Sequence, residues 1–416
     1  MSSRRTRWPY LKSQDCVSAY MRAIVVATLL ILTACGSAPA HQAGATFQPS
    51  ASHGPTSSDV ASQSRTSTPA PLSISSAPPA GGLLFAVVEG GSGENPDTVA
   101  IVGLDGYARA KAKFQSRQPI YAGGSPIERS YVPLQAVAQV VGDRVFYIDG
   151  YGAIRALRVG SQPQLLATFA QQPSQFETWF AVSPDGSSFV AGQLQFPAVG
   201  PAPSGGAPSL VGTWKFNYAR ADAGGPTQVL RHFETADITK EVNTFPVGWI
   251  ATGPVAMVPL YIWTQTLWAG GPIFLVDAKG ALSTRVGGAD CDSAASITRD
   301  GLVACGGAVR DATGRVKWTT QVAFGDPRQV HISPDGNALA GNDCSPVDGS
   351  QVEVRGHGLV GMPAGFCVEG WMDSNTVVGR VIQSNGAQGN LTWISLGAPT
   401  KLHDLGFKGD FVATLG

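Results

Sequence analysis

The residues of this chain that could perform chemistry are few and lie far apart along its 416 positions. The six histidines stand singly, without the paired spacing of a zinc site, at positions 41, 53, 232, 331, 357 and 403. The sequence contains no G-x-S-x-G nucleophile elbow, no H-E-x-x-H motif and no phosphate-binding loop. Asp290 and Asp292 in "ADCD" could contribute Ca²⁺ ligands, although solvent-facing carboxylates in a turn are the more frequent form of such a pair. The sequence therefore indicates no catalytic residues, no metal site and no cofactor.

Five side chains are candidates for binding. His331, Glu369 and Asp373 stand in the segments "VHIS" and "EGWMD", which are otherwise apolar or small. Trp263 and Trp268 lie in the weakly charged segment "YIWTQTLWAGG", where exposed rings could stack on a sugar or a partner protein. Burial between elements of the core is the alternative interpretation for both tryptophans.

One short phrase, written three times, points to the elements that must position these residues. It appears as "FAVSPDGSSFVAG" at 180–192, "SITRDGLVACG" at 296–306 and "HISPDGNALAG" at 331–341. Each copy is typical of a strand, a tight turn and a second strand. In "SPDG" the proline presets φ for a type I turn, the aspartate accepts hydrogen bonds from the turn backbone, and the glycine takes a positive φ.

The phrases belong to longer units of four short apolar runs separated by turn residues. Six such units are indicated, at 134–169, 178–233, 246–286, 294–322, 329–361 and 366–405. Residues 83–114 supply only three strands, and "GDFVATLG" at 409–416 supplies the missing one. The pattern predicts an all-β fold, a β-propeller of seven four-stranded blades over 83–416 closed by its C-terminal strand, with six or eight blades as alternatives.

The repeated phrases resemble the TolB-type and WD-repeat-like propellers of bacterial envelope proteins, whose blades carry "SPDG" at the first turn. The resemblance covers 83–416, with good matches at 183–186 and 333–336 and a partial one in "TRDG" at 298–301. The "WD" dipeptide of true WD repeats is absent. The resemblance implies the architecture and leaves the function open, because propellers host unrelated activities.

The N-terminal residues carry a predicted export and lipidation signal. Residues 1–34 contain a short apolar run typical of a signal peptide, which ends in "LTAC". This motif resembles the lipobox of bacterial lipoproteins, which implies lipidation of Cys35 and cleavage before it; an ordinary signal peptide with a chance cysteine is the alternative. Residues 35–82, rich in Ser, Thr, Pro and Ala, are typical of a disordered linker. We therefore expect a lipid anchor on the extracytoplasmic side of the cell membrane.

Four cysteines remain in the propeller region: Cys291, Cys305, Cys344 and Cys367. An even number in an exported domain indicates disulfides, for which three pairings exist. Antiparallel strand order favours Cys291–Cys305 within one blade and Cys344–Cys367 between neighbouring blades. The alternative, a metal site, lacks C-x-x-C spacing.

The net charge and the residues of the predicted inner strands limit the classes of function that the sequence supports. The 29 basic and 29 acidic residues cancel, which argues against nucleic acid as a partner. Trp179, Trp249 and Trp371 lie in or near the inner strands, where tryptophans more often belong to the core between blades. The sequence favours a non-catalytic binding or scaffold module for protein or glycan, with contact segments at 196–209 and 261–271. The alternative is a propeller enzyme, of lyase, glycosidase or lactonase type, with its site in the central channel.

Overall fold

The structure is a computed structural model that describes residues 74, 82–90, 96–115, 121–122, 125–126, 137–171, 176–197, 212–236, 244–258, 261–262, 267–268, 271–322, 330–341, 346–347 and 349–416. The predicted signal peptide, Cys35 and almost all of the predicted linker lie outside this part of the chain. Ile74, one of two described linker positions, packs against a buried cluster in the sixth and seventh blades. Within these ranges no helix has the length and apolar character needed to cross a membrane.

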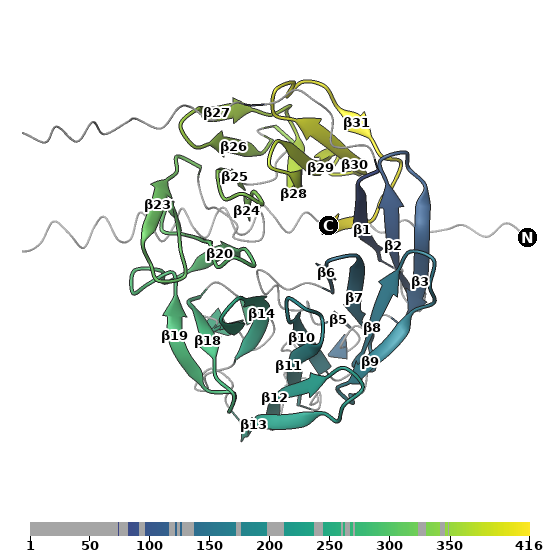
Figure 1. The fold of residues 1–416 in the computed structure, drawn as a ribbon, viewed down its shortest axis with the longest axis vertical. Coiled ribbons are helices and arrows are strands. Elements are labelled where there is room, and N and C mark those ends of the chain that lie inside the picture. Colours follow the sequence, from purple (N-terminus) through teal and green to yellow (C-terminus); the bar gives the residue numbers. More distant parts are fainter. Residues whose placement is uncertain are drawn as a thin grey trace, which may run out of the picture. The chain divides into compact units, whose positions relative to one another are not determined.

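Seven four-stranded antiparallel sheets form the blades of a β-propeller, as the repeats predict (Figure 1). The first blade consists of β1 (Leu84–Glu89), β2 (Asp97–Gly103), β3 (Ala108–Phe114) and β32 (Asp410–Leu415). The second consists of β6 (Ala138–Val141), β7 (Arg144–Ile148), β8 (Ala153–Arg158) and β9 (Gln164–Thr168). The third consists of β10 (Phe176–Val182), β11 (Ser188–Gln195), β12 (Trp214–Asp222) and β13 (Gln228–Thr235).

The fourth blade consists of β14 (Phe245–Ile250), β15 (Gly253–Met257), β18 (Ile273–Val276) and β19 (Leu282–Val286). The fifth consists of β20 (Ala294–Ile297), β21 (Val303–Cys305), β22 (Ala308–Arg310) and β23 (Val316–Thr319). The sixth consists of β24 (His331–Ile332), β25 (Ala338–Gly341), β26 (Gln351–Val354) and β27 (Gly358–Gly361). The seventh consists of β28 (Phe366–Asp373), β29 (Thr376–Ile382), β30 (Gln388–Ser395) and β31 (His403–Asp404). Two small hairpins are added, β4 (Tyr121–Ala122) with β5 (Ser125–Pro126) and β16 (Tyr261–Ile262) with β17 (Leu267–Trp268).

The C-terminal strand closes the ring. The strand order of the first blade is β3-β2-β1-β32, so β32 is its innermost strand (Figure 1). It pairs antiparallel with β1 from Leu84↔Leu415 to Val88↔Asp410. The first and last parts of the propeller are therefore joined by backbone hydrogen bonds within one sheet.

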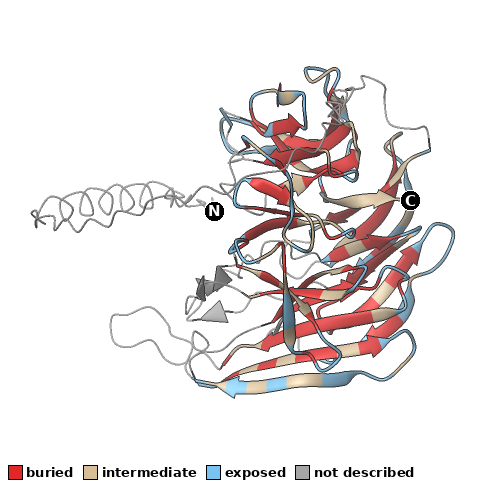
Figure 2. Ribbon diagram, turned by 60° about the vertical axis from the view of Figure 1, so that its left-hand side comes forward, coloured by how far each residue is buried: buried red, intermediate tan, exposed pale blue. Residues whose placement is uncertain are grey.

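Buried residues lie mainly in the strands within the blades, whereas exposed residues concentrate in the turns and outermost strands (Figure 2). The largest buried cluster runs through the third, fourth and fifth blades. Within it the rings of Trp179 and Phe245 join two neighbouring blades with centroids 4.0 Å apart. The outermost β13 shows the opposite pattern, with no fully buried residue.

The repeated phrase forms the turn that follows the inner strand of a blade. In the third blade the Ser183 hydroxyl donates to Asp185 and accepts from the backbone N–H of Ser188 at 2.9 Å. Ser333 and Asp335 repeat this arrangement in the sixth blade. Hydrogen bonds from the hydroxyls of Ser183 and Ser187 and from the Ser187 backbone N–H lower the pKa of Asp185 to about 2.

In the third blade this turn also contacts the preceding blade. Gly186 has a φ of +70°, and a Cβ there would lie 2.5 Å from Nη2 of Arg144 in the second blade. Arg144 in turn donates from Nη2 to the carbonyl oxygen of Asp185 at 2.9 Å. The glycine of the motif is therefore required by both backbone conformation and space. The phrase recurs because each copy forms the turn between the first two strands of its blade.

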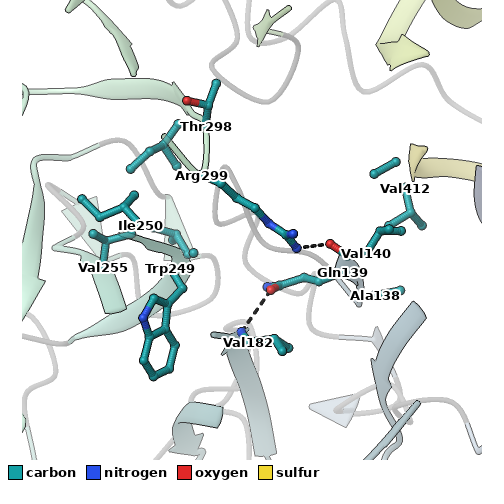
Figure 3. A pocket seen from close by; sticks show the side chains of 14 residues that line it. Ala138, Gln139, Val140, Val182, Trp249, Ile250, Val255, Thr298, Arg299 and Val412 are labelled. Atoms are coloured by element: carbon teal, nitrogen blue, oxygen red, sulfur yellow. Dashed lines mark hydrogen bonds between the residues drawn. The ribbon is translucent and has the colours of Figure 1, made fainter. Parts of the chain in front are cut away.

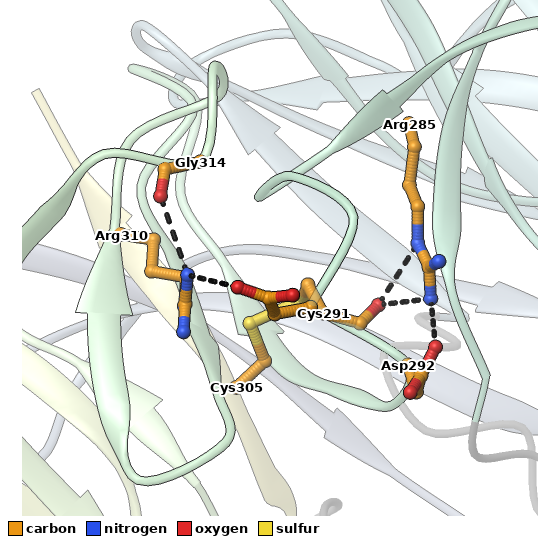
Figure 4. Close-up of a disulfide and its surroundings, with 7 residues drawn as sticks. Arg285, Cys291, Asp292, Cys305, Arg310 and Gly314 are labelled. Atoms are coloured by element: carbon orange, nitrogen blue, oxygen red, sulfur yellow. Dashed lines mark hydrogen bonds and ion pairs between the residues drawn. A yellow bond between two sulfur atoms is a disulfide. The ribbon is translucent and has the colours of Figure 1, made fainter. Parts of the chain in front are cut away.

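A disulfide joins Cys291 and Cys305 within the fifth blade, with Cα atoms 5.6 Å apart, as predicted (Figure 4). Arg285 donates to the Cys291 carbonyl oxygen at 2.8 Å and to Asp292 at 2.5 Å. Oδ2 of Asp290 lies 4.0 Å from Nη1 of Arg310. Each carboxylate of "ADCD" is therefore close to an arginine. Cys367 is also disulfide-bonded, but its partner lies outside the described residues. The pairing with Cys344 stays a prediction.

We expect replacement of both Cys291 and Cys305 by Ala to lower the free energy of unfolding by about 2–4 kcal/mol. The bond closes a loop with a sequence separation of 14, and its loss restores conformational entropy to the unfolded chain. Urea denaturation of oxidised wild type and the double variant would measure the difference. Equal midpoints and equal slopes would show that the bond adds no stability.

Candidate functional site

A cavity of about 210 Å³ lies in the central channel and is lined by five of the seven blades (Figure 3). Its wall is mainly apolar, and Val182, Ile250 and Val412 are typical members. Polar side chains enter it from Gln139, Thr298 and Arg299. None of the described residues that line it carries a carboxylate, so Arg299 is the one charged group among them.

Arg299 occupies the second position of "TRDG", where the other two copies of the phrase have Pro184 and Pro334. Its guanidinium crosses the channel from the fifth blade and donates to the carbonyl oxygen of Val140 in the second blade (Figure 3). Arg299 is exposed to the channel, but the protein that surrounds its guanidinium partly desolvates the positive charge and lowers its pKa. The ion pairs between described residues do not include Arg299.

Gln139 lies on the opposite wall and ties two blades together. Its Nε2 donates to the Phe180 carbonyl oxygen at 2.8 Å, and its Oε1 accepts from the Val182 backbone N–H at 3.2 Å (Figure 3). The amide is thereby held by the neighbouring strand β10. Neither Gln139 nor Arg299 stood out in the sequence; the one available signal was an arginine at the proline position of the repeated turn.

Glu369, a predicted binding residue, lies on the inner strand β28 in an ion pair with Arg380. Its second carboxylate oxygen accepts from the backbone N–H of Phe411 at 3.0 Å. Burial raises the pKa of Glu369, and the Arg380 guanidinium acts in the opposite direction. These contacts connect Glu369 to the closing strand β32.

His331 and Asp373 lie on neighbouring inner strands, β24 and β28. The His331 ring hydrogen-bonds to the backbone of Val368, and its carbonyl oxygen accepts from Nε1 of Trp371 at 2.9 Å. Asp373 accepts from the backbone N–H of Asn375 at 2.8 Å and so stabilises the turn after β28. In each case the contacts are with the blade framework.

The tryptophans divide between core and channel. Trp179 and Trp371 are buried in clusters between blades, as expected for tryptophans of the inner strands. Trp249 is only partly buried and lines the cavity. Trp263 lies outside the described residues, and for Trp268 only the backbone, in β17, is described. The role of Trp263 and Trp268 in binding stays a prediction.

We expect the free energy of unfolding to decrease as the pH falls from 6.5 to 4, by up to about 3 kcal/mol through His331. Burial lowers the pKa of His331 from 6.5 to about 4, so in this window the unfolded chain binds a proton that the folded chain does not. His331→Gln should flatten the profile, measured by urea denaturation at several pH values. The exposed His357, changed to Gln, is the matched control. His403, whose pKa is also lowered, is present in both variants, so its contribution to the two profiles is the same. Superimposable profiles for His331→Gln and wild type would contradict this assignment.

Comparison with known proteins identifies no family for this chain. No described protein family and no curated protein matches the sequence. Similar solved structures include a chain of the mitotic checkpoint complex, with 14% identity, a TM-score of 0.42, and coverage of 72% of this chain and 88% of that one. An oligogalacturonate lyase from Vibrio parahaemolyticus has 8% identity and a TM-score of 0.43, with 75% and 90% covered. A putative TolB from Agrobacterium tumefaciens has 11% identity and a TM-score of 0.32, with 74% and 88% covered. At these identities the likeness concerns the fold alone.

Proposed function

We propose that this chain is a membrane-anchored envelope lipoprotein whose propeller is a non-catalytic binding module for a protein or glycan. One observation supports the proposal: His331, Glu369 and Asp373, the sequence-predicted ionisable residues on the inner strands, all make contacts with the blade framework. Glu369 is paired with Arg380, and Asp373 stabilises a turn. General acid–base catalysis needs an ionisable side chain, such as His, Asp or Glu, within hydrogen-bond reach of the reacting group. The described part of the cavity offers a single charged group, Arg299.

The topology of the blades supports one face as the contact surface. In each blade the second and third strands connect at the end opposite the repeated turns. β11 ends at Gln195 and β12 begins at Trp214, while β15 ends at Met257 and β18 begins at Ile273. Both intervals therefore open at the same end of the propeller. Contact segments carried by rigid strands at one end suit recognition of a partner.

The proposed membrane anchor rests on the lipobox-like motif. We expect Cys35 to carry the lipid, because "LTAC" resembles a lipobox and acyl chains bind a bilayer with about 0.8 kcal/mol per buried CH₂. Metabolic labelling with a fatty-acid analogue should mark the wild type and not Cys35→Ala. Cys291→Ala is the matched control. Equal labelling of the Cys35→Ala protein would refute the anchor.

The binding proposal is tested on the full chain, purified in detergent. The immobilised protein is exposed to envelope extract and to a glycan array, and the same preparation is screened for lyase, glycosidase and lactonase turnover. We expect saturable capture of one partner and no turnover above buffer. Turnover that disappears on changing His331, Glu369 or Asp373 would replace the proposal by the enzyme alternative.

A further inference from the structure

Among the described residues, the channel cavity holds one positive charge, on Arg299, and no carboxylate. The ion pairs between described residues do not include Arg299, so none of them compensates its charge. One hydrogen bond, to the Val140 carbonyl oxygen, engages the guanidinium. A guanidinium has five N–H donors in a planar fork, so most of its donor capacity is available to a ligand. Arg299 is also exposed, so that a ligand can reach it from solvent.

The rest of the cavity wall is suited to contact with the apolar part of a ligand. Valine and isoleucine side chains surround the cavity from the second, third, fourth, fifth and first blades, at Val140, Val182, Val255, Ile297 and Val412. The polar atoms of Gln139 on this wall are bound to the backbone of β10. The volume of about 210 Å³ lies below the range of roughly 300–1,000 Å³ of sites for drug-sized ligands. The cavity therefore fits a compact molecule with one polar end.

We propose that this cavity binds a small organic monoanion, with its carboxylate on Arg299 and its apolar body against the valine and isoleucine wall. The proposal rests on the proposed binding function and adds a ligand class and a site to it. Carboxylate matches the planar donor fork and forms charge-assisted hydrogen bonds. A single positive charge in apolar surroundings compensates one negative charge. Inorganic phosphate, strongly hydrated and without an apolar part, fits this wall poorly.

The site is separate from the proposed contact surface for a partner. Thr298 and Arg299 belong to the turn after β20, at the end of the blade where the repeated phrases lie. The intervals between β11 and β12 and between β15 and β18 open at the other end. A small anion and a larger partner can therefore be bound independently.

Isothermal titration calorimetry on the full chain in detergent tests the proposal with benzoate as the probe. Benzamide has the same ring without the charge, and so also controls for partition into detergent. We expect benzoate to bind at least ~10-fold more tightly than benzamide, and Arg299→Gln to weaken benzoate binding at least ~10-fold. Inorganic phosphate at the same concentrations should produce no binding signal. Undetectable benzoate binding, equal affinity for both probes, or phosphate binding as tight as benzoate would each overturn the proposal.

Matched variants separate the anion site from a purely structural role of Arg299. Arg144→Gln also removes an arginine-to-carbonyl hydrogen bond between blades, but outside the cavity, and should leave benzoate affinity unchanged. Gly248→Val places methyl groups in the cavity from a position where a Cβ meets Val255 at an ordinary 3.6 Å, and should weaken benzoate with Arg299 intact. This variant decides the question if Arg299→Gln does not fold. Unchanged affinity in Gly248→Val and in a folded Arg299→Gln would show that the anion binds elsewhere.

Failure of this proposal differs from failure of the proposed function. Partner capture without benzoate binding would refute the anion site alone. Turnover dependent on His331, Glu369 or Asp373 would refute the non-catalytic function alone, whatever the calorimetry shows.

Discussion

Deletion of residues 409–416 should abolish the cooperative unfolding transition of the propeller and cause aggregation. These residues contain β32, the innermost strand of the first blade, and their removal leaves β1 with an unpaired inner edge. It also removes Phe411, whose ring lies 6.1 Å from that of Phe85, and the cavity residues Val412 and Ala413. The loss is comparable to the whole stability of an ordinary domain, about 5–15 kcal/mol.

Circular dichroism melting and light scattering would measure this effect on the truncated and complete chains. A deletion of equal length inside the predicted linker, residues 50–57, is the control and should leave the melting temperature unchanged. A truncated protein that melts cooperatively at the wild-type temperature would show that closure by β32 is dispensable.

Arg380→Met should lower the free energy of unfolding by up to about 3–5 kcal/mol, because it leaves the partly buried carboxylate of Glu369 without its cation. Arg380 is only 5% exposed and is bonded to Glu369. It also donates to the carbonyl oxygens of Lys408 at 3.2 Å and Gly409 at 3.1 Å, immediately before β32. The side chain thus holds the closing strand to the seventh blade.

A double-mutant cycle in urea tests the origin of that loss. We expect the double variant Arg380→Met with Glu369→Met to be more stable than Arg380→Met alone, because the uncompensated charge is gone. The exposed ion pair of Arg158 with Asp143 is the matched control, and Arg158→Met should cost less than about 1 kcal/mol. Strictly additive losses in the cycle would mean that Glu369 and Arg380 do not stabilise the fold as a pair.

Local patterns predicted the architecture because each blade is built from neighbours in sequence. "SPDG" at 183–186 specifies a turn through its own Ser, Asp and Gly, and the strands on either side pair with each other. The three-strand unit at 83–114 and the spare strand at 409–416 then required closure of the ring. Cys291 and Cys305 could be paired because two adjacent strands bring them together.

The sequence alone thus predicted the fold class, seven blades as the preferred number, their closure and one disulfide, since all of these depend on periodicity and short-range order. Tertiary structure alone decided which charged groups meet. Arg299 reaches Val140 across 159 positions, and Glu369 reaches Phe411 across 42. Such contacts leave no periodic pattern, because they depend on how the blades are arranged around the channel. The same arrangement places Glu369 in the ring closure and Arg299 in the cavity, which residue types by themselves could not distinguish.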